Sequence, residues 1–499
     1  MRKKILISIL IVLLMLFSST AYSKIIEKEK LEDFDPLVDT TVTVEIKQIR
    51  FLEEKGLGPG SKAITHSWFN FLPEFLQNLL SKRNEIQTVN ANTNPSLYVE
   101  IYINDNKFTS DIWEDKKYIY DISWDATLDV PDDEEFVDIK IQLWDDLSNT
   151  LFDISGDSGT SEDGHDAELE YSIKTGRWTG DDELSDKSGY GRLCGCDDGT
   201  IYTKDQDSEL WFNIYQNDYD EDGIPYWTEV NEYGTDPESK NSGDPDGDGI
   251  PVSWEWKWGY NPFSSENHDI LDSDGDSINN FEEYLTSEVF SDPFRKDVFI
   301  ELDIMEEGPE GQVTRFPLSA KELMTTSFNR QNILLNIDYN TMGGTDIIPF
   351  AHKIGYRDLN DIYRDYFLHN NQSNWRRGVF HYGLVVYSTE GPAGYMYRPN
   401  AFQISSSGHE LIINEEGIDE DIVYGSAYMH ELGHTFDFWP IPGHDRNQGP
   451  IEWLINTRYR SCMNYCWMYE FVDYSDGTHG GVDIDDWERI DYSAFEREW

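Results

Sequence analysis

Apolar and polar residues alternate with a period of two in the N-terminal third of the chain. The alternation runs through residues 41–49, 96–105 and 135–146. A period of two places the apolar side chains of each run on one face of a strand. In the third run this face carries Val137, Ile139, Ile141 and Leu143. Aspartate-rich turns separate the runs, so we predict an all-β sandwich over residues 24–212.

The C-terminal part, residues 294–499, mixes continuous apolar runs with helical periodicity. Buried strands are predicted over residues 296–305, 333–339 and 379–388, and an edge strand over residues 400–414. Helices are predicted over residues 317–331 and 420–438. This mixture predicts an α+β domain, and the whole chain is therefore expected to be multidomain.

The first 23 residues have the pattern of a secretory signal peptide. Basic residues at positions 2–4 precede an apolar run over residues 5–17, and residues 21–23 form a small-x-small cleavage site. A membrane anchor is the alternative, but the apolar run is short for crossing a bilayer. We therefore expect the protein to be secreted, extracellular or cell-surface associated, with no stable membrane insertion after cleavage.

The chain is strongly acidic, with a formal net charge of −57. Such a charge repels nucleic acid and anionic membrane surfaces, which argues against nucleic acid as a partner. Two explanations for the acidic residues compete: carboxylates that bind calcium, and a solvated acidic surface.

The four cysteines are too few for a disulfide scaffold in a chain of 499 residues. Cys194 lies close to Cys196 in the sequence, and Cys462 lies close to Cys466. Secretion permits one or two disulfides, and the sequence leaves three pairings open.

Residues 213–293 contain a threefold repeat. Each repeat reads D-x-D-x-D and carries Glu at its twelfth position. Calcium takes roughly six to eight oxygen ligands, and carboxylates at positions one, three and five converge when the chain coils around the ion. The Glu at position twelve reaches back and binds with both oxygens. The predicted calcium ligands are Asp218, Asp220, Asp222, Glu229, Asp244, Asp246, Asp248, Glu255, Asp272, Asp274, Asp276 and Glu283.

The sixth position of each loop must bend sharply, which suits glycine. Gly223 and Gly249 stand there in the first two loops, and Ser277 stands there in the third, which we expect to bind calcium least well. The segments YGTDP, WGYNP and VFSDP follow the loops in register. With these motifs the block resembles thrombospondin type 3 and EF-hand-like calcium repeats, which implies a compact rod with bound Ca²⁺. An acidic turn cluster without metal is the alternative.

The predicted sandwich, with its aspartate-rich loops, resembles the calcium-dependent β-sandwiches of the C2 kind. That resemblance implies calcium at one end of the sandwich. A sandwich whose acidic loops are merely exposed is the alternative.

The segment YMHELGHTFDF contains His-Glu-x-x-His. On a helix, His430 and His434 lie on one face, a turn apart, where both imidazoles can bind one zinc ion. Glu431 can then take a proton from a zinc-activated water that attacks a peptide carbonyl. A chance match in a surface or core helix is the alternative.

A second motif follows in the segment Ser-Cys-Met-Asn-Tyr, residues 461–465. It resembles the Met-turn of the metzincin zinc peptidases, and the resemblance covers about residues 294–499. It implies a zincin-type domain in which Met463 packs under the zinc site as a structural residue. It also implies that Tyr465 approaches the metal and stabilises an oxyanion. The alternatives are a core methionine and a packed aromatic ring.

The chain departs from the metzincin pattern after His434. Asp437 stands at the usual glycine, and Pro440, which has no metal-binding side chain, stands at the usual third ligand. Without the glycine, the helix is expected to continue to about residue 438. Asp437 is too far along the helix axis to reach the metal and is expected to support the site from outside the ligand set.

The longer loop after Pro440 favours His444 as the third zinc ligand. Asp445 and Glu452 remain alternatives.

Together these patterns predict a secreted, calcium-stabilised zinc endopeptidase with protein or peptide as its substrate. Its expected architecture is an N-terminal β-sandwich, a calcium-binding repeat rod and a C-terminal metzincin-like catalytic domain. The alternative is a non-enzymatic calcium-binding cell-surface or adhesion protein with a relic peptidase fold. A relic site gains nothing by keeping Glu431, which favours the enzyme.

Overall fold

The computed structural model describes residues 40–51, 94–120, 122–155, 165–181, 191–195, 208–241, 243–338, 342, 346–445 and 449–494. The predicted signal peptide and Cys196 lie outside these ranges. Within them, no helix has the length and the apolar composition needed to cross a membrane.

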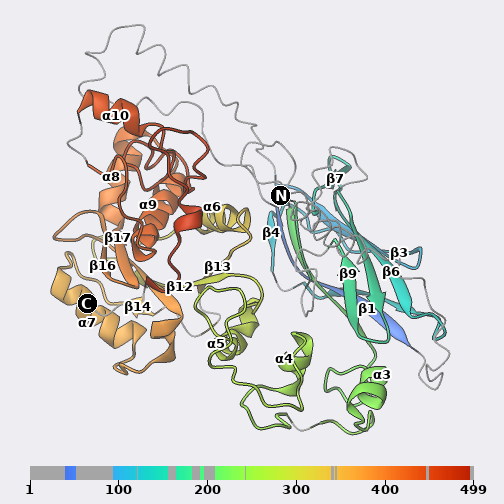
Figure 1. The fold of residues 1–499 in the computed structure, drawn as a ribbon. Helices are drawn as coiled ribbons and strands as arrows, with labels where there is room; N and C mark the ends of the chain where they lie inside the picture. Colours follow the sequence, from blue (N-terminus) through green and yellow to red (C-terminus); the bar gives the residue numbers. More distant parts are fainter. Residues whose placement is uncertain are drawn as a thin grey trace, which may run out of the picture.

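Two antiparallel sheets form the N-terminal part (Figure 1). The first sheet has the order β10-β11-β1-β4, and β5 also pairs with β1. Its strands are β1 (Thr41–Phe51), β4 (Tyr118–Ile119), β5 (Trp124–Asp129), β10 (Gly191–Cys194) and β11 (Ser208–Gln216). The last strand therefore continues past the predicted limit at residue 212.

The second sheet has the order β3-β2-β6-β8-β9, and β7 pairs with β6. Its strands are β2 (Leu97–Ile103), β3 (Asn106–Thr109), β6 (Phe136–Asp145), β7 (Thr150–Phe152), β8 (Ala167–Ser172) and β9 (Arg177–Gly180). Alternate residues of both sheets, such as Val44 of β1 and Ile139 of β6, share one hydrophobic core.

The acidic repeats form the segment that runs from the sandwich to the C-terminal sheet (Figure 1, green). Their short helices are α3 (Tyr226–Thr228), η5 (Glu229–Tyr233), α4 (Val252–Lys257), α5 (Asn280–Leu285) and η6 (Ser287–Val289). Ile250, Trp254 and Trp258 make a small core inside the segment. Ile278 and Val289 of the third repeat instead pack into the core under the C-terminal sheet.

The C-terminal sheet has the order β13-β12-β15-β17-β16, and β14 pairs with β12. Its strands are β12 (Asp297–Met305), β13 (Leu334–Asp338), β14 (Ile347–Ile348), β15 (Phe380–Val386), β16 (Gly394–Arg398) and β17 (Ala401–Ser405). All pairings are parallel except that of β16 with β17, which is antiparallel.

Helices cover both faces of this sheet because its strands are apolar on both sides. Helices α6 (Leu318–Asn329) and α9 (Glu420–Thr435) share a core with Ile300 and Leu302 of β12. Helices α7 (Tyr356–Ile362) and η7 (Tyr363–Phe367) share the opposite core with Phe299. The remaining helices are η8 (Trp375–Gly378), α8 (Ser406–Glu416), α10 (Pro450–Asn456) and η9 (Trp487–Arg489).

The predicted edge strand over residues 400–414 is wrong in two respects. Strand β17 pairs on both sides, with β15 and β16, so it is an interior strand. It ends at Ser405, and the second half of the predicted strand forms helix α8. All five residues of β17 are buried, because helices and neighbouring strands surround it. The edge strand is β16, which the sequence did not reveal.

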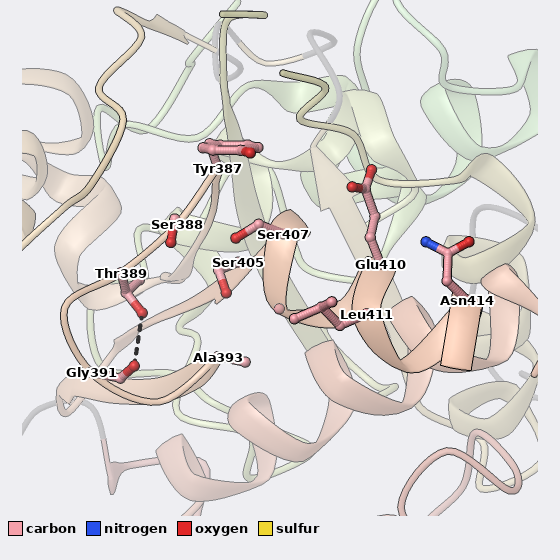
Figure 2. A pocket seen from close by; sticks show the side chains of 11 residues that line it. Tyr387, Ser388, Thr389, Gly391, Ala393, Ser405, Ser407, Glu410, Leu411 and Asn414 are labelled. Carbon is pink, nitrogen blue, oxygen red and sulfur yellow. Dashed lines mark hydrogen bonds between the residues drawn. The ribbon is translucent and has the colours of Figure 1, made fainter. Parts of the chain in front are cut away.

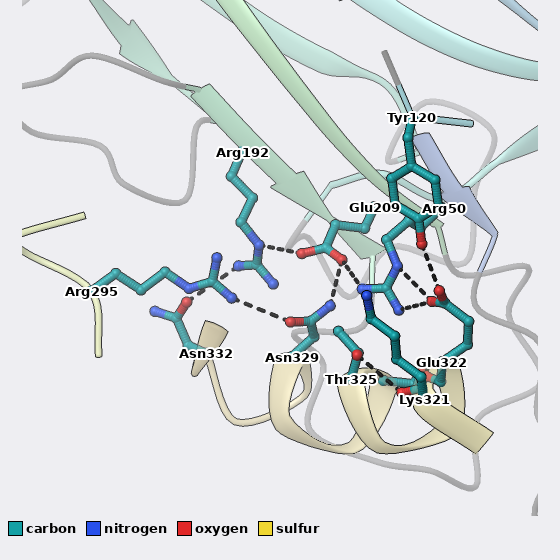
Figure 3. Close-up of polar contacts among 11 residues, drawn as sticks. Arg50, Tyr120, Arg192, Glu209, Arg295, Lys321, Glu322, Thr325, Asn329 and Asn332 are labelled. Carbon is teal, nitrogen blue, oxygen red and sulfur yellow. Dashed lines mark hydrogen bonds and ion pairs between the residues drawn. The ribbon is translucent and has the colours of Figure 1, made fainter. Parts of the chain in front are cut away.

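A buried polar cluster joins the sandwich to helix α6 (Figure 3). Arg50 of β1 donates hydrogen bonds to Glu322 of α6 at 2.7 and 3.0 Å and to Glu209 of β11 at 3.0 Å. Arg192 pairs with the other oxygen of Glu209, and Tyr120 donates to Glu322 at 2.5 Å. The side chains of Arg50, Glu209 and Glu322 are at most 2 % exposed.

Replacing Arg50 with alanine is expected to destabilise the protein by about 3–5 kcal/mol, because Glu322 would stay buried without its cation. Chemical unfolding followed by tryptophan fluorescence measures the change. Lys47→Ala is the matched control on the same strand, since Lys47 makes a partly exposed pair with Glu45 and should change stability by less than about 0.5 kcal/mol. Equal stability of the two variants would contradict a structural role for the cluster.

Candidate metal centre

Helix α9 carries His430, Glu431 and His434 and starts at a well-formed N-terminus. The side chain of Asp419 caps the helix by accepting a hydrogen bond from the backbone N–H of Asp421 at 3.0 Å. Two acidic residues in the first turn also suit the positive end of the helix dipole. His430 and Glu431 are 2 % and 5 % exposed, so the motif lies inside the domain and not on a surface helix.

Helix α9 ends at Thr435, which corrects the predicted continuation to residue 438. The N–H of Phe438 bonds to the carbonyl of Gly433, and the N–H of Asp437 bonds to that of His434. These two bonds form a Schellman motif, which needs a left-handed residue after the helix. Asp437 takes this conformation with φ of 62°. Aspartate tolerates the left-handed region better than most side chains, so it replaces the usual glycine. Its side chain is exposed.

Three histidines come together beside this helix end. Each of His430, His434 and His444 offers a nitrogen, and these nitrogens lie within 4.8 Å of one another. The Nε2 atoms of His430 and His444 are 3.1 Å apart. A tetrahedral zinc ion at about 2.0–2.1 Å from each nitrogen would separate two ligand nitrogens by about 3.3 Å. The spacing therefore fits a zinc ion.

The protonation of two rings also suits a metal. His430 Nδ1 donates a hydrogen bond to the carbonyl of Cys462 at 2.8 Å, since a carbonyl can only accept, and this leaves Nε2 with its lone pair. Burial, and then the nearby His444, lowers the pKa of His434 to about 3. The ring of His434 is therefore neutral at physiological pH and can bind a cation.

The structure places His444, rather than the two alternatives, beside the helix histidines. Asp445 and Glu452 are exposed, and neither belongs to the group of three ligand atoms described above. The loop bearing His444 is supported by the turn at residues 461–465. The backbone N–H of Tyr465 donates to the carbonyl of Gly443 in this loop. The side-chain amide of the neighbouring Asn464 donates to the carbonyls of Asn456 and Tyr459 at 2.8 Å each, which fixes the turn that supports the loop.

The residues of the predicted Met-turn lie next to the histidines. Met463 is fully buried, and a Cβ added to Gly433 would lie 2.4 Å from its sulfur, so the turn packs directly under helix α9. The ring of Tyr465 stacks on His444 with 4.3 Å between centroids. Cys462 and Cys466 are buried and form no disulfide, whereas Cys194 is disulfide-bonded.

The edge strand β16 passes close to Glu431, which the sequence did not predict. A Cβ added to Gly394 would lie 2.4 Å from Glu431 Oε1, so a larger residue here would displace the Glu431 carboxylate. Among the described strands, β16 pairs with β17 alone. The backbone of an edge strand can pair with another extended chain.

A cavity of about 510 Å³ lies next to the start of β16 (Figure 2). Its wall combines the segment after β15, the end of β17 and helix α8. The lining residues are mostly small or polar: Tyr387, Ser388, Thr389, Gly391, Ala393, Ser405, Ser407, Gly408, Glu410, Leu411 and Asn414. Glu410 is the charged side chain in this lining.

The three acidic loops share one backbone geometry. The first Asp of each loop accepts a hydrogen bond from the backbone N–H at the sixth position: 2.7 Å at Gly223, 3.0 Å at Gly249 and 3.1 Å at Ser277. Ser277 adopts the same left-handed region as the two glycines, with φ of 71°. The loop with serine is thus folded like the others, at a local conformational cost.

Buried carboxylate oxygens in these loops fit a bound cation. One oxygen each of Asp220, Asp246 and Asp274, and both of Glu255 and Glu283, are buried without a hydrogen-bond partner. Burial, and then neighbouring carboxylates, raise the pKa of Glu255 to about 8. Burial also raises the pKa of Glu229 to about 7. Burial and mutual repulsion both make the charged carboxylates costly. A bound calcium ion, which takes oxygen ligands, would offset the cost of burial and the cost of repulsion.

Known proteins offer little guidance. No protein-family model and no curated protein matches the sequence. A C2 domain-containing protein from a putative elicitor-responsive gene is similar over 35% of this chain and 86% of its own, at 11% identity and a TM-score of 0.17. Human GIVD cytosolic phospholipase A2 is similar over 36% of this chain but only 16% of its own, at 11% identity and a TM-score of 0.17. At TM-scores this low, neither similarity bears on the fold or function of this chain.

Proposed function

We propose that the chain is a secreted zinc-dependent endopeptidase that calcium stabilises. The observation that carries this proposal is the convergence of His430, His434 and His444 beside the buried carboxylate of Glu431. Three imidazoles with a carboxylate next to one of them suit hydrolysis. A site that only stored metal would have no use for Glu431.

The chain's own residues divide the work as follows. Zinc, when bound, supplies a Lewis acid that makes water acidic and polarises a carbonyl. Glu431 accepts a proton from the attacking water and can return it to the leaving amine. Tyr465, whose ring stacks on His444, donates its hydroxyl hydrogen to the substrate oxygen that gains negative charge.

The substrate is proposed to be an extended peptide. Strand β16, which pairs on one side only among the described strands, offers a backbone edge that passes Glu431. A peptide can add to such an edge by main-chain hydrogen bonds. The cavity at the start of β16 would then receive one substrate side chain. Its small polar lining and the carboxylate of Glu410 favour a small or basic side chain.

The calcium loops suit a second candidate equally well, a non-enzymatic surface protein, because they stiffen a rod in either case.

Metal removal separates the two functions. The purified chain with calcium present should cleave an unstructured protein such as casein. Cleavage should stop when a zinc-selective chelator is added and return when zinc is restored. A folded, zinc-loaded chain that cleaves neither casein nor a peptide library would favour the surface protein.

A further inference from the structure

The third acidic loop lies at the junction with the C-terminal sheet. In each repeat, one backbone N–H beyond the loop donates to the fifth-position Asp of that loop. Asn241 donates to Asp222 at 3.2 Å, and Glu266 donates to Asp248 at 3.0 Å. In the third repeat the donor is Asp297, which bonds to Asp276 at 2.7 Å. These three donors are structurally equivalent in their repeats. We name this place the closing position, and it is occupied by Asn241, Glu266 and Asp297.

The side chains at the closing position differ in a way that separates the third repeat from the others. The side-chain amide of Asn241 donates to Asp222 at 2.6 Å and to Glu229 at 3.1 Å, so it satisfies one acceptor on each carboxylate. Glu266 is exposed to solvent. Asp297 is 1 % exposed and brings one more carboxylate into its loop.

The carboxylate of Asp297 is only half satisfied. Its Oδ2 accepts the backbone N–H of Asp292 at 3.0 Å, while its Oδ1 is buried without a hydrogen-bond partner. Glu283 is also 1 % exposed, and neither of its oxygens has a partner. Two buried carboxylates, one in the third repeat and one at the start of β12, therefore have oxygens without hydrogen-bond partners, which is costly without a cation.

The hydrogen bond from the backbone N–H of Asp297 to Asp276 brings the start of β12 to the third loop, and the charges of these carboxylates act on one another. Burial, followed by the charge of Asp297, raises the pKa of Glu283 well above its usual range. Burial, followed by the charge of Asp276, does the same for the pKa of Asp297, and Arg295 opposes this shift only in part. Burial raises the pKa of Asp274, and the cation of Lys296 opposes this rise with a smaller effect.

We propose that Asp297 is a ligand of the calcium ion of the third loop, so that this ion ties the repeats to the C-terminal sheet. Asp297 is the first residue of β12, which pairs with β13, β14 and β15. Ile278 and Val289 of the same repeat already pack in the core with Phe299 of β12. The additional carboxylate offsets the conformational cost of the left-handed Ser277. Calcium at this loop therefore orders the sheet on which helix α9 rests.

Calcium titration of the full-length, zinc-loaded chain tests the ligand. Wild type should bind three ions at the acidic loops, and Asp297→Asn should bind one of them about tenfold or more weakly. Glu266→Gln is the matched control at the closing position of the second repeat, and it should bind like wild type. Wild-type affinity at all three loops in Asp297→Asn would overturn the proposal.

Thermal unfolding with and without calcium separates ligation from ordinary packing. Asp297→Asn relieves repulsion in the calcium-free chain, so without calcium its melting temperature should equal or exceed that of wild type. When calcium is added, the melting temperature of wild type should rise by more than that of Asp297→Asn. A variant that is less stable by the same amount in both conditions would show a packing role and no ligation.

A measurement on the wild type alone covers the case in which the variant does not fold. Hydrogen exchange across the start of β12 should slow when calcium is added. Exchange that calcium leaves unchanged would overturn the proposal. None of these readouts requires peptide cleavage, so failure of the proposed peptidase function would leave them interpretable.

Discussion

The Glu431→Gln variant is expected to bind zinc like the wild type and to lose about 10²–10⁴-fold in kcat for peptide hydrolysis. Glutamine has the same shape and keeps the contact with strand β16, but it cannot accept a proton. Because the side chain is 5 % exposed, bulk water has little access to replace it as a base. A fluorogenic peptide assay measures kcat, and atomic absorption measures zinc per chain.

Glu420→Gln is the control for this experiment. Glu420 lies in the first turn of the same helix and pairs with Arg315 at a partly exposed site. This variant should keep wild-type kcat and zinc content. Wild-type hydrolysis by Glu431→Gln would rule out Glu431 as the general base, whatever its zinc content.

Replacing His444 with alanine should weaken zinc binding by about a hundredfold or more and remove activity with it. Two histidines on α9 would remain, and two ligands hold zinc poorly. The helix should stay folded, because Met429 and Leu432 pack in the core of the domain and do not depend on the His444 side chain. Zinc competition with a chromogenic chelator gives the affinity, and circular dichroism reports the fold.

Asp445→Ala and Glu452→Ala complete the series. Both side chains are exposed, so both variants should retain zinc. If His444→Ala kept its zinc while one of these variants lost it, the third ligand would be reassigned.

The sequence predicted those parts of the site that depend on short-range chemistry. The turns of the three acidic loops follow from residue type and spacing, and calcium binding at these loops stays a prediction. His430 and His434 needed only the helical period. His444 followed from the loss of metal-binding chemistry at Pro440 and the length of the loop after it.

The features that the sequence missed depend on long-range packing. Strand β16 is short and only partly buried, so its composition does not distinguish it from a loop. The end of α9 was misjudged because Asp437 adopts a conformation that glycine more often supplies. Asp297 looked like part of an ordinary buried strand, and only the fold brings it to Asp276.

The loop origin of His444 has a kinetic consequence for the metal. A ligand on a loop can swing away by local opening while helix α9 stays intact, so zinc release should begin there. The stacked ring of Tyr465 and its backbone bond to Gly443 resist that opening. For a zinc ion bound as proposed, the residence time would therefore depend on the loop and the turn beneath it, separately from the affinity of the two helix histidines. Tyr465 would then slow the release of the metal, in addition to donating a hydrogen bond to the substrate.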